Sequence, residues 1–213
     1  MKAENSRHNK TGNMLNNQSP REILHQFYID NNLDDDGGQK SSSVKVELTK
    51  KIHFYFPNFD ARRKAVMKHD IHHLVTGYST SLIGESEISA WEIASGCKSY
   101  WFAFFIDTSG FMMGLPINFI RVLKAFSRGR RTKNLYSDHI STDQAMDMKI
   151  GELKRVLELD IVGPGTKPTI IDFLLFSLFA LFGLIYSLLM LPLFPFVLIY
   201  SIYIQLSKQK GKN

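Results

Sequence analysis

The stretch KHDIHHLVTGYSTSLIGE, from Lys68 to Glu85, decides the predicted fold because it joins two helices through a short turn. Asp60 can cap a helix over Ala61 to Val75, and Gly77 supplies a C-terminal stop, since glycine adopts the left-handed conformation that ends many helices. The first half of the stretch is therefore predicted to be the end of a helix.

The second half of the stretch begins the next helix. Ser79 or Thr80 can cap this helix, which we expect to continue through Glu85 and Trp91 to about Gly96. The turn between the two helices is short, so the second can fold back beside the first. That reversal would bring Glu85 to the histidines of the first helix.

The histidines have the spacing of a helical metal site. His69 and His73 are four residues apart and share one helix face, with about 6 Å between their Cβ atoms. Asp70 can reach the edge of the same site and Glu85 can supply a fourth ligand, whereas His72 lies on a neighbouring face. Two imidazoles and two carboxylates suit zinc best, with iron or manganese as alternatives. We predict His69, Asp70, His73 and Glu85 as metal ligands and catalytic residues.

Three other interpretations of these residues stay open or are disfavoured. In the simplest one, His72 and His73 cover the surface and His69 pairs with Asp70. A zincin needs HExxH, and Asp70 stands at the glutamate position, which argues against protease chemistry. A His-Asp phosphohydrolase would also need an upstream histidine and a later aspartate, for which the candidates are His25, His53, Asp107 and Asp138.

Charge is distributed unevenly along the 213 residues. All 20 acidic residues lie at or before Asp172, and 3 of the 26 basic residues lie after it, so the body carries 23 − 20 = +3. The densest basic cluster is only Arg128 to Lys133, which disfavours a nucleic-acid partner. The single cysteine, Cys97, excludes an intrachain disulfide and leaves nitrogen and oxygen ligands for any metal, which fits a reducing compartment.

The C-terminal region is apolar and predicted to enter a membrane. Phe173 to Ile204 would form a helix of about 48 Å, longer than a hydrocarbon core of roughly 30 Å. Pro192 and Pro195 interrupt it, so we expect a kinked, tilted span or a helical hairpin. The terminal lysines and an N-terminus without an apolar signal segment place the body on the cytoplasmic side.

The predicted fold class is all-α, with four regions. Residues 1–43 are mostly disordered, with a short helix near 20–30 that begins at Ser19-Pro20. Residues 44–168 form the helical metal-binding body, 169–207 the membrane-embedded segment and 208–213 a basic tail.

Three segments of the body carry their own predictions. Residues 44–56 alternate in part, so helix and strand compete there, and helix is favoured. Residues 100–117 are expected to form apolar helical pieces that line a cleft. An amphipathic helix with Ile150, Leu153 and Leu157 on one side follows residues 137–142.

The same stretch carries a resemblance to a known family. His69, Asp70, His73 and Glu85 match the signature HDxxH, eleven residues, then E of the coenzyme Q (ubiquinone) biosynthesis protein 4 family. The resemblance covers about residues 60 to 160, and Ser89 and Ala90 depart from the usual basic and bulky aromatic residues. Further matching positions are Gly77, Thr80, Gly84, Trp91-Glu92, Gly129-Arg130-Arg131 and Asn134-Leu135-Tyr136.

The resemblance implies a mainly helical, divalent-metal-binding protein at the membrane surface that serves ubiquinone synthesis. Such proteins are associated with C1 decarboxylation, coupled to hydroxylation, of a polyprenyl-hydroxybenzoate and with organising the biosynthetic complex. The implied partners are membrane lipid, the polyprenylated quinone precursor, other quinone-biosynthesis enzymes and a possible second copy of the chain. The alternative is a non-catalytic scaffold that binds prenyl lipid, followed at lower rank by the phosphohydrolase. Glu92 could support the ligands, and the arginines near 128–131 could hold an anionic group or form a solvated face.

Overall fold

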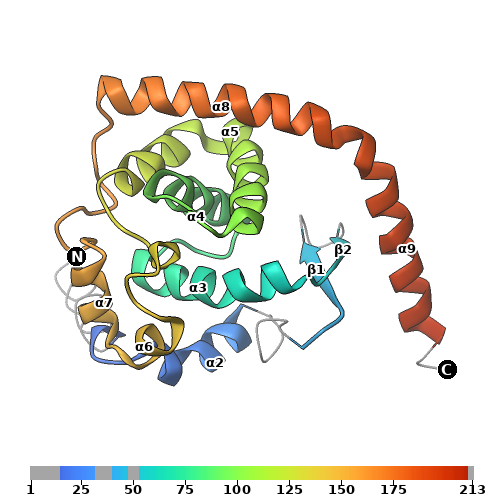
Figure 1. Ribbon diagram of the computed structural model, residues 1–213, viewed down its shortest axis with the longest axis horizontal. Coiled ribbons are helices and arrows are strands. Elements are labelled where there is room, and N and C mark those ends of the chain that lie inside the picture. Colours follow the sequence, from blue (N-terminus) through green and yellow to red (C-terminus); the bar gives the residue numbers. More distant parts are fainter. Residues whose placement is uncertain (1–14, 32–39, 48–52, 211–213) are drawn as a thin grey trace, which may run out of the picture.

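The computed structural model describes residues 15–31, 40–47 and 53–210 and confirms the predicted all-α class (Figure 1). A single small antiparallel hairpin accompanies the helices in this part of the chain. In chain order the elements are α2 (Pro20–Asp30), β1 (Ser43–Glu47), β2 (His53–Pro57), α3 (Asp60–Thr76), α4 (Leu82–Ser95), α5 (Trp101–Gly129), η1 (Leu135–Ser137), α6 (Thr142–Asp147), α7 (Ile150–Val156), α8 (Ile170–Met190), η2 (Leu191–Leu193) and α9 (Phe194–Lys210).

The turn between α3 and α4 forms as the sequence predicts, but the cap of α4 does not. Gly77 ends α3 with φ +78°, a left-handed conformation that disfavours any side chain. Ser81, rather than Ser79 or Thr80, caps α4 by accepting a hydrogen bond from the Gly84 N–H. The prediction was wrong because the other two hydroxyls have other partners: that of Ser79 bonds Ser81, and that of Thr80 donates to Asn31.

Helix α5 bends around α4 and packs closely against it (Figure 1). The close approach depends on small residues, since a Cβ added at Gly110 would lie 2.4 Å from Ser89 Oγ and one at Gly114 would lie 2.3 Å from Ser86 Cβ. Asn118 is non-helical, with φ −156° and ψ 81°, two residues after Pro116. This proline removes a helical hydrogen bond and accounts for the bend.

Two apolar cores lie on opposite sides of α4. The first fills the space between α2, α3, α4 and the α6–α7 region, and its members include Tyr28, Trp91 and Leu153. The second joins α4, α5 and α8 through Phe111, Val122 and Phe176. Helix α4 is therefore buried on both sides, which fixes the position of the polar side chains that it carries.

Residues 44–47 and 53–56 lie in two paired strands, so the preference for a helix was wrong for the described part of this segment. Strands β1 and β2 pair antiparallel, with Ser43 opposite Pro57 and Val44 opposite Phe56. The alternating valines of β1 and the aromatic residues of β2 favour extended backbone. The amphipathic helix predicted around Ile150 is also divided, into the short helices α6 and α7.

The apolar C-terminal region is a bent helix that follows two sides of the body (Figure 1). Helix α8 lies along α5, and α9 turns from it toward β2, where the Tyr55 N–H donates to Ser201 Oγ at 3.1 Å. The bend lies at η2, between Pro192 and Pro195, which confirms the predicted interruption. The hairpin alternative is not formed, because α9 does not return along α8. Residues 101–129 and 170–207 are each long and apolar enough to cross a membrane.

Residues 1–43 were predicted to be mostly disordered, and two parts of this region, 1–14 and 32–39, lie outside the described residues. The described residues that follow the first part have a defined contact, since the Ile150 N–H donates to the Gln18 carbonyl at 2.8 Å. The predicted helix near 20–30 is confirmed as α2, and the Glu22 carboxylate accepts the Ser19 N–H at its start.

Candidate metal centre

Three of the four predicted ligands converge between α3 and α4. The Nε2 atoms of His69 and His73 are 3.2 Å apart, and each lies 3.3 Å from an oxygen of the Glu85 carboxylate. The two histidines come from successive turns of α3 and the carboxylate from the first turn of α4. The reversal at Gly77 therefore brings together residues that are far apart along the helices.

Hydrogen bonds on the far side of each ring determine which nitrogen faces the centre as an acceptor. His73 Nδ1 lies 2.9 Å from the Tyr78 carbonyl and His69 Nδ1 lies 3.0 Å from the Glu92 carboxylate. Carbonyl and carboxylate oxygens only accept, so both Nδ1 atoms carry the proton. In the neutral rings both Nε2 lone pairs then point at Glu85 and at one another, an arrangement that a positive ion stabilises.

The size of the triangle fits a small divalent ion. Zinc bonds of about 2.0–2.1 Å at tetrahedral angles place neighbouring ligand atoms roughly 3.3 Å apart. The two Nε2 atoms are 3.2 Å apart, and each lies 3.3 Å from a different oxygen of the Glu85 carboxylate, so the separations are close to this value. Two imidazoles and one carboxylate also leave a fourth tetrahedral position, as in zinc sites that carry water or substrate.

The pKa shifts of His69 and Glu85 show that the centre attracts positive charge. Burial opposes a charge on His69, but the Glu92 and Glu85 carboxylates more than offset this and hold the pKa of His69 well above its ordinary value. Burial raises the pKa of Glu85, but the hydrogen bonds and charges of His69 and His73 outweigh burial and lower it to about 2. Without an ion, the centre therefore binds a proton.

Glu92 is the main support of the ligands and is fully buried. Its carboxylate accepts hydrogen bonds from His69 Nδ1 and from His72 Nδ1, with the Tyr136 hydroxyl at 3.4 Å. Burial raises the pKa of Glu92, and the charge and hydrogen bonds of His69 and His72 lower it well below its ordinary range. A buried carboxylate that holds the far nitrogen of a ligand histidine fixes the ring and strengthens it as a ligand.

His72 points away from the centre, as the helix geometry predicted. Its Nε2 accepts the Leu135 N–H at 2.9 Å, so the ring is a neutral link between α3, Glu92 and the Leu135–Tyr136 segment. Burial and, less strongly, the neighbouring histidines lower the pKa of His72, against the opposing effect of Glu92. The interpretation of His72 as surface cover is wrong, since its side chain is completely buried.

Asp70 lies outside the converging group. Its Oδ2 accepts a hydrogen bond from the Tyr28 hydroxyl at 2.8 Å, which ties α2 to α3. Burial raises the pKa of this carboxyl, against the lowering effect of the nearby histidines and Arg62. The ligand role of Asp70 stays a prediction, and the Tyr28 contact had no signal in the sequence because the two residues are 42 positions apart.

The residues proposed for a phosphohydrolase do not join this group. Asp138 pairs with Lys68 and accepts from the Tyr100 hydroxyl, and within the described part of the chain neither His25 nor His53 belongs to a potential metal-binding group. Asp107 does lie near the centre, grouped with His69 and Glu92, where it accepts a weak hydrogen bond from Cys97. It is buried, and it belongs to the group that contains Glu92 and not to the one that contains Glu85.

The arginines near 128–131 have partners inside the protein. Arg128 is buried, donates to the carbonyls of Thr76 and Val162, and lies over the Tyr78 ring. Arg130 and Arg131 both pair with the buried Asp172 at the start of α8. The sequence analysis left two interpretations open, an anion site and a solvated face, and the contacts of Arg130 and Arg131 support a third, the attachment of α8.

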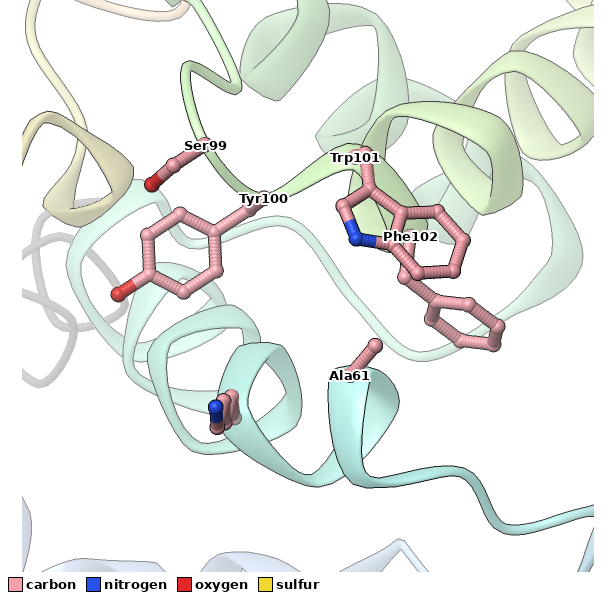
Figure 2. Close-up of a pocket in the computed structure, with 6 residues that line it drawn as sticks. Ala61, Ser99, Tyr100, Trp101 and Phe102 are labelled. Atoms are coloured by element: carbon pink, nitrogen blue, oxygen red, sulfur yellow. The ribbon is translucent and has the colours of Figure 1, made fainter.

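The structure has a cavity that the candidate ligands do not line, and Figure 2 shows the residues that line it. It has a volume of about 350 Å³ and lies between the first turns of α3, with Ala61 and Lys64, and the segment Ser99–Phe102. Of the apolar residues 100–117 predicted to line a cleft, only the first three contribute. None of His69, His73 and Glu85 lines this cavity.

Comparisons of the chain with family models, with curated proteins and with solved structures found no match. The function is therefore argued from the geometry of the site and from the resemblance in its sequence.

Proposed function

We propose that this protein is a membrane-associated, divalent-metal-dependent protein of ubiquinone biosynthesis that acts in C1 decarboxylation of a polyprenyl-hydroxybenzoate. The observation that carries the proposal is the convergence of His69, His73 and Glu85, with both imidazole lone pairs directed at one point. These are three of the four residues of the HDxxH and glutamate signature. Zinc fits the donor set best, and iron and manganese remain alternatives.

The number of ligands favours an enzyme over a scaffold. An ion that only stabilises a fold has a complete set of protein ligands, whereas a catalytic ion keeps a position for substrate or water. Asp70, the fourth predicted ligand, is engaged by Tyr28. The Glu85 side chain is 39% exposed, so the centre has an opening on the Glu85 side.

The residues around the centre have distinct roles in this proposal. His69, His73 and Glu85 would hold the ion, which would supply Lewis-acid stabilisation of the negative charge that develops as the ring carboxylate leaves. Glu92 holds the His69 ring in the orientation that directs Nε2 to the centre, and the Tyr78 carbonyl does the same for His73. The buried surroundings exclude water from the rear of the site, which strengthens each of these interactions.

Membrane association follows from the apolar helices and suits the substrate. The region 170–207 combines high hydropathy with a buried share of only 11%, so most of it has no protein cover. A polyprenyl precursor resides in lipid, and an enzyme at the membrane surface can reach its aromatic head. The cytoplasmic side and the other quinone-biosynthesis enzymes as partners are part of this proposal.

Turnover by the purified protein tests the proposal. In detergent and under air, the protein should release carbon dioxide from a polyprenyl-hydroxybenzoate labelled in the carboxylate, and elemental analysis should find about one divalent ion per chain. His73→Ala should lose both the ion and the turnover. Unchanged turnover in His73→Ala would remove the metal from the mechanism, whereas ion binding without turnover would support the scaffold.

A further inference from the structure

Helix α8 presents a continuous apolar surface to the outside. Between residues 173 and 190 every exposed side chain is apolar except Ser177. Exposed leucines recur at helical spacing, for example Leu174 at 62%, Leu181 at 55% and Leu188 at 62%. This surface continues onto α5 through Phe105 and Phe119, which contact α8 rings and are themselves about 40% exposed.

The opposite face of α8 is fixed to the body at several points along its length. At the start of the helix, Asp172 is buried and pairs with both Arg130 and Arg131. One turn later, Phe176 is completely buried against Phe111 and Phe126. Further contacts follow, where Gly183 allows close approach of Met112 and where Tyr186 stacks on Phe105.

These contacts conflict with a perpendicular crossing of a bilayer by α8. The helix runs antiparallel to α5, which packs closely on α4, and α4 carries Glu85 and Glu92. If α8 crossed the membrane, the attached helices would bring these carboxylates and the histidines to the depth of the hydrocarbon, where charged groups are costly. Detachment of α8 would instead expose the Asp172 ion pairs and the Phe176 core.

The geometry points to a different arrangement: α8 lies parallel to the membrane plane in one leaflet, with its exposed face and the adjoining face of α5 in contact with acyl chains. The body, with its metal centre, and the C-terminal end of α9 then lie on the same side of the membrane. This inference rests on the membrane association included in the proposed function. It replaces the spanning segment by an in-plane attachment.

The chemistry of the surface favours phospholipid over a protein as the occupant. Protein interfaces carry about one hydrogen bond per 100–200 Å², and a single exposed serine on α8 cannot provide that number. Trp101, 59% exposed at the start of α5, has the position and type of an aromatic residue at a lipid–water boundary.

The protein offers a direct measurement of this arrangement because it has only two tryptophans. Trp91 is completely buried, so Trp101→Phe leaves a background tryptophan shielded from lipid. Into this background we would introduce Leu174→Trp, Leu181→Trp and Leu188→Trp one at a time. The full-length variants would be placed in phosphatidylcholine–phosphatidylglycerol vesicles that contain phospholipids brominated at different acyl positions.

The in-plane arrangement predicts similar quenching depths at the three positions, all within one leaflet, and no quenching of Trp91. A spanning helix would change the depth by about 10 Å from one position to the next, since seven residues rise by that amount. Such a gradient overturns the inference and leaves membrane association intact. Failure of the full-length protein to float with vesicles overturns the membrane association itself, and with it this inference.

A second readout guards against misfolding of the tryptophan variants. Cys97 is buried, so a cysteine introduced at each of the same positions can be labelled selectively with a depth-sensitive fluorophore. Equal label depths at residues 174, 181 and 188 support the in-plane helix, and a stepwise change contradicts it.

Discussion

Two groups of ionisable residues in this molecule differ in how their hydrogen-bond donors and acceptors are balanced. In the Asp172 group, one buried carboxylate accepts from Arg130 on one oxygen and from Arg131 and the Thr169 N–H on the other. In the centre formed by His69, His73 and Glu85, two lone pairs and a carboxylate face the same point. The first group is internally complete, and the second is the one that we propose to bind a cation.

The comparison shows that donor and acceptor balance, rather than the density of charged residues, distinguishes a structural cluster from a binding site. The Arg128–Lys133 segment has the densest positive charge of the body, yet two of its arginines, Arg130 and Arg131, pair with Asp172 and attach α8. The centre has fewer charges, and the buried acceptors behind its rings direct the lone pairs inward. Substitutions in one group at a time, with zinc affinity and stability measured for each variant, test this difference.

The largest effect is expected when Glu85 loses its charge. Glu85→Gln keeps the size of the side chain but removes the anionic ligand, so affinity for zinc should fall by more than about 100-fold, beyond the loss typical for residues that only support a ligand. Isothermal titration of the metal-free protein measures the change.

Glu87→Gln is the matched control for this variant. Glu87 lies on the same helix and pairs with Arg121, away from the centre, so its substitution should leave zinc affinity unchanged. Equal losses in the two variants would mean that general negative charge, rather than the three converging atoms, attracts the ion.

The next largest effect should be on stability. Asp172→Ala leaves Arg130 and Arg131 without their partner and should destabilise the protein by about 2–3 kcal/mol, less than for a fully buried pair because both arginines are about one-third exposed. This corresponds to a fall of about 5–10 °C in the thermal unfolding midpoint.

Asp172→Asn should fall between the wild type and Asp172→Ala, because the amide oxygen can still accept the Thr169 N–H. Zinc affinity should be unchanged in both variants. A large loss of zinc binding would show that the two groups are coupled and would contradict the comparison.

Glu92→Gln should have a smaller effect on binding than the loss of a ligand. The amide can still contact His69 and His72 but carries no charge, so zinc affinity should fall by about 10–100-fold while the stoichiometry stays at one ion. Tyr136→Phe is the control, since the hydroxyl is 3.4 Å from Glu92 and its loss should change affinity little. Loss of stoichiometry in Glu92→Gln would make Glu92 itself a ligand.

Much of this arrangement follows from local sequence signals. The spacing of His69 and His73, the glycine at position 77 and the length of the following turn are sufficient to predict the helix pair and the approach of Glu85. Pro192 and Pro195 likewise predict the bend of the C-terminal helix. Each of these inferences needs only helix geometry and the conformational limits of proline or glycine.

The remaining features depend on contacts between distant parts of the chain. Tyr28 bonds Asp70 across 42 residues, and Arg130 and Arg131 bond Asp172 across more than 40. No periodicity in the sequence encodes such pairs. The ligand role of Asp70 and the roles of the arginines were therefore predicted without knowledge of these contacts. The β-hairpin was missed because its aromatic strand could equally have been one side of a short helix.

The smallest expected effect is a difference in pH dependence between the two groups. The pKa of Asp172 is lowered to about 2 because the Thr169 backbone and the two arginines outweigh the effect of burial. A carboxyl group with a lowered pKa contributes stability to the fold at pH values above its pKa in the unfolded chain. This contribution is lost as the pH falls through about 2. The attachment of α8 should therefore be insensitive to pH between 6 and 8.

The metal centre should respond in that range because the pKa of His69 is raised. In the ion-free protein, the raised pKa contributes stability to the fold at pH values below the pKa of His69 in the unfolded chain. This contribution is lost as the pH rises through the pKa of His69 in the folded protein. An ion must displace the same proton, so zinc affinity should increase about tenfold per pH unit until the pKa of His69 is reached. Titration in buffers of different ionisation enthalpy should detect close to one proton released per ion at pH 7. Release of no proton would show that the ion binds to a ring that is already neutral, and the attraction of the centre for positive charge would then be weaker than its carboxylates imply.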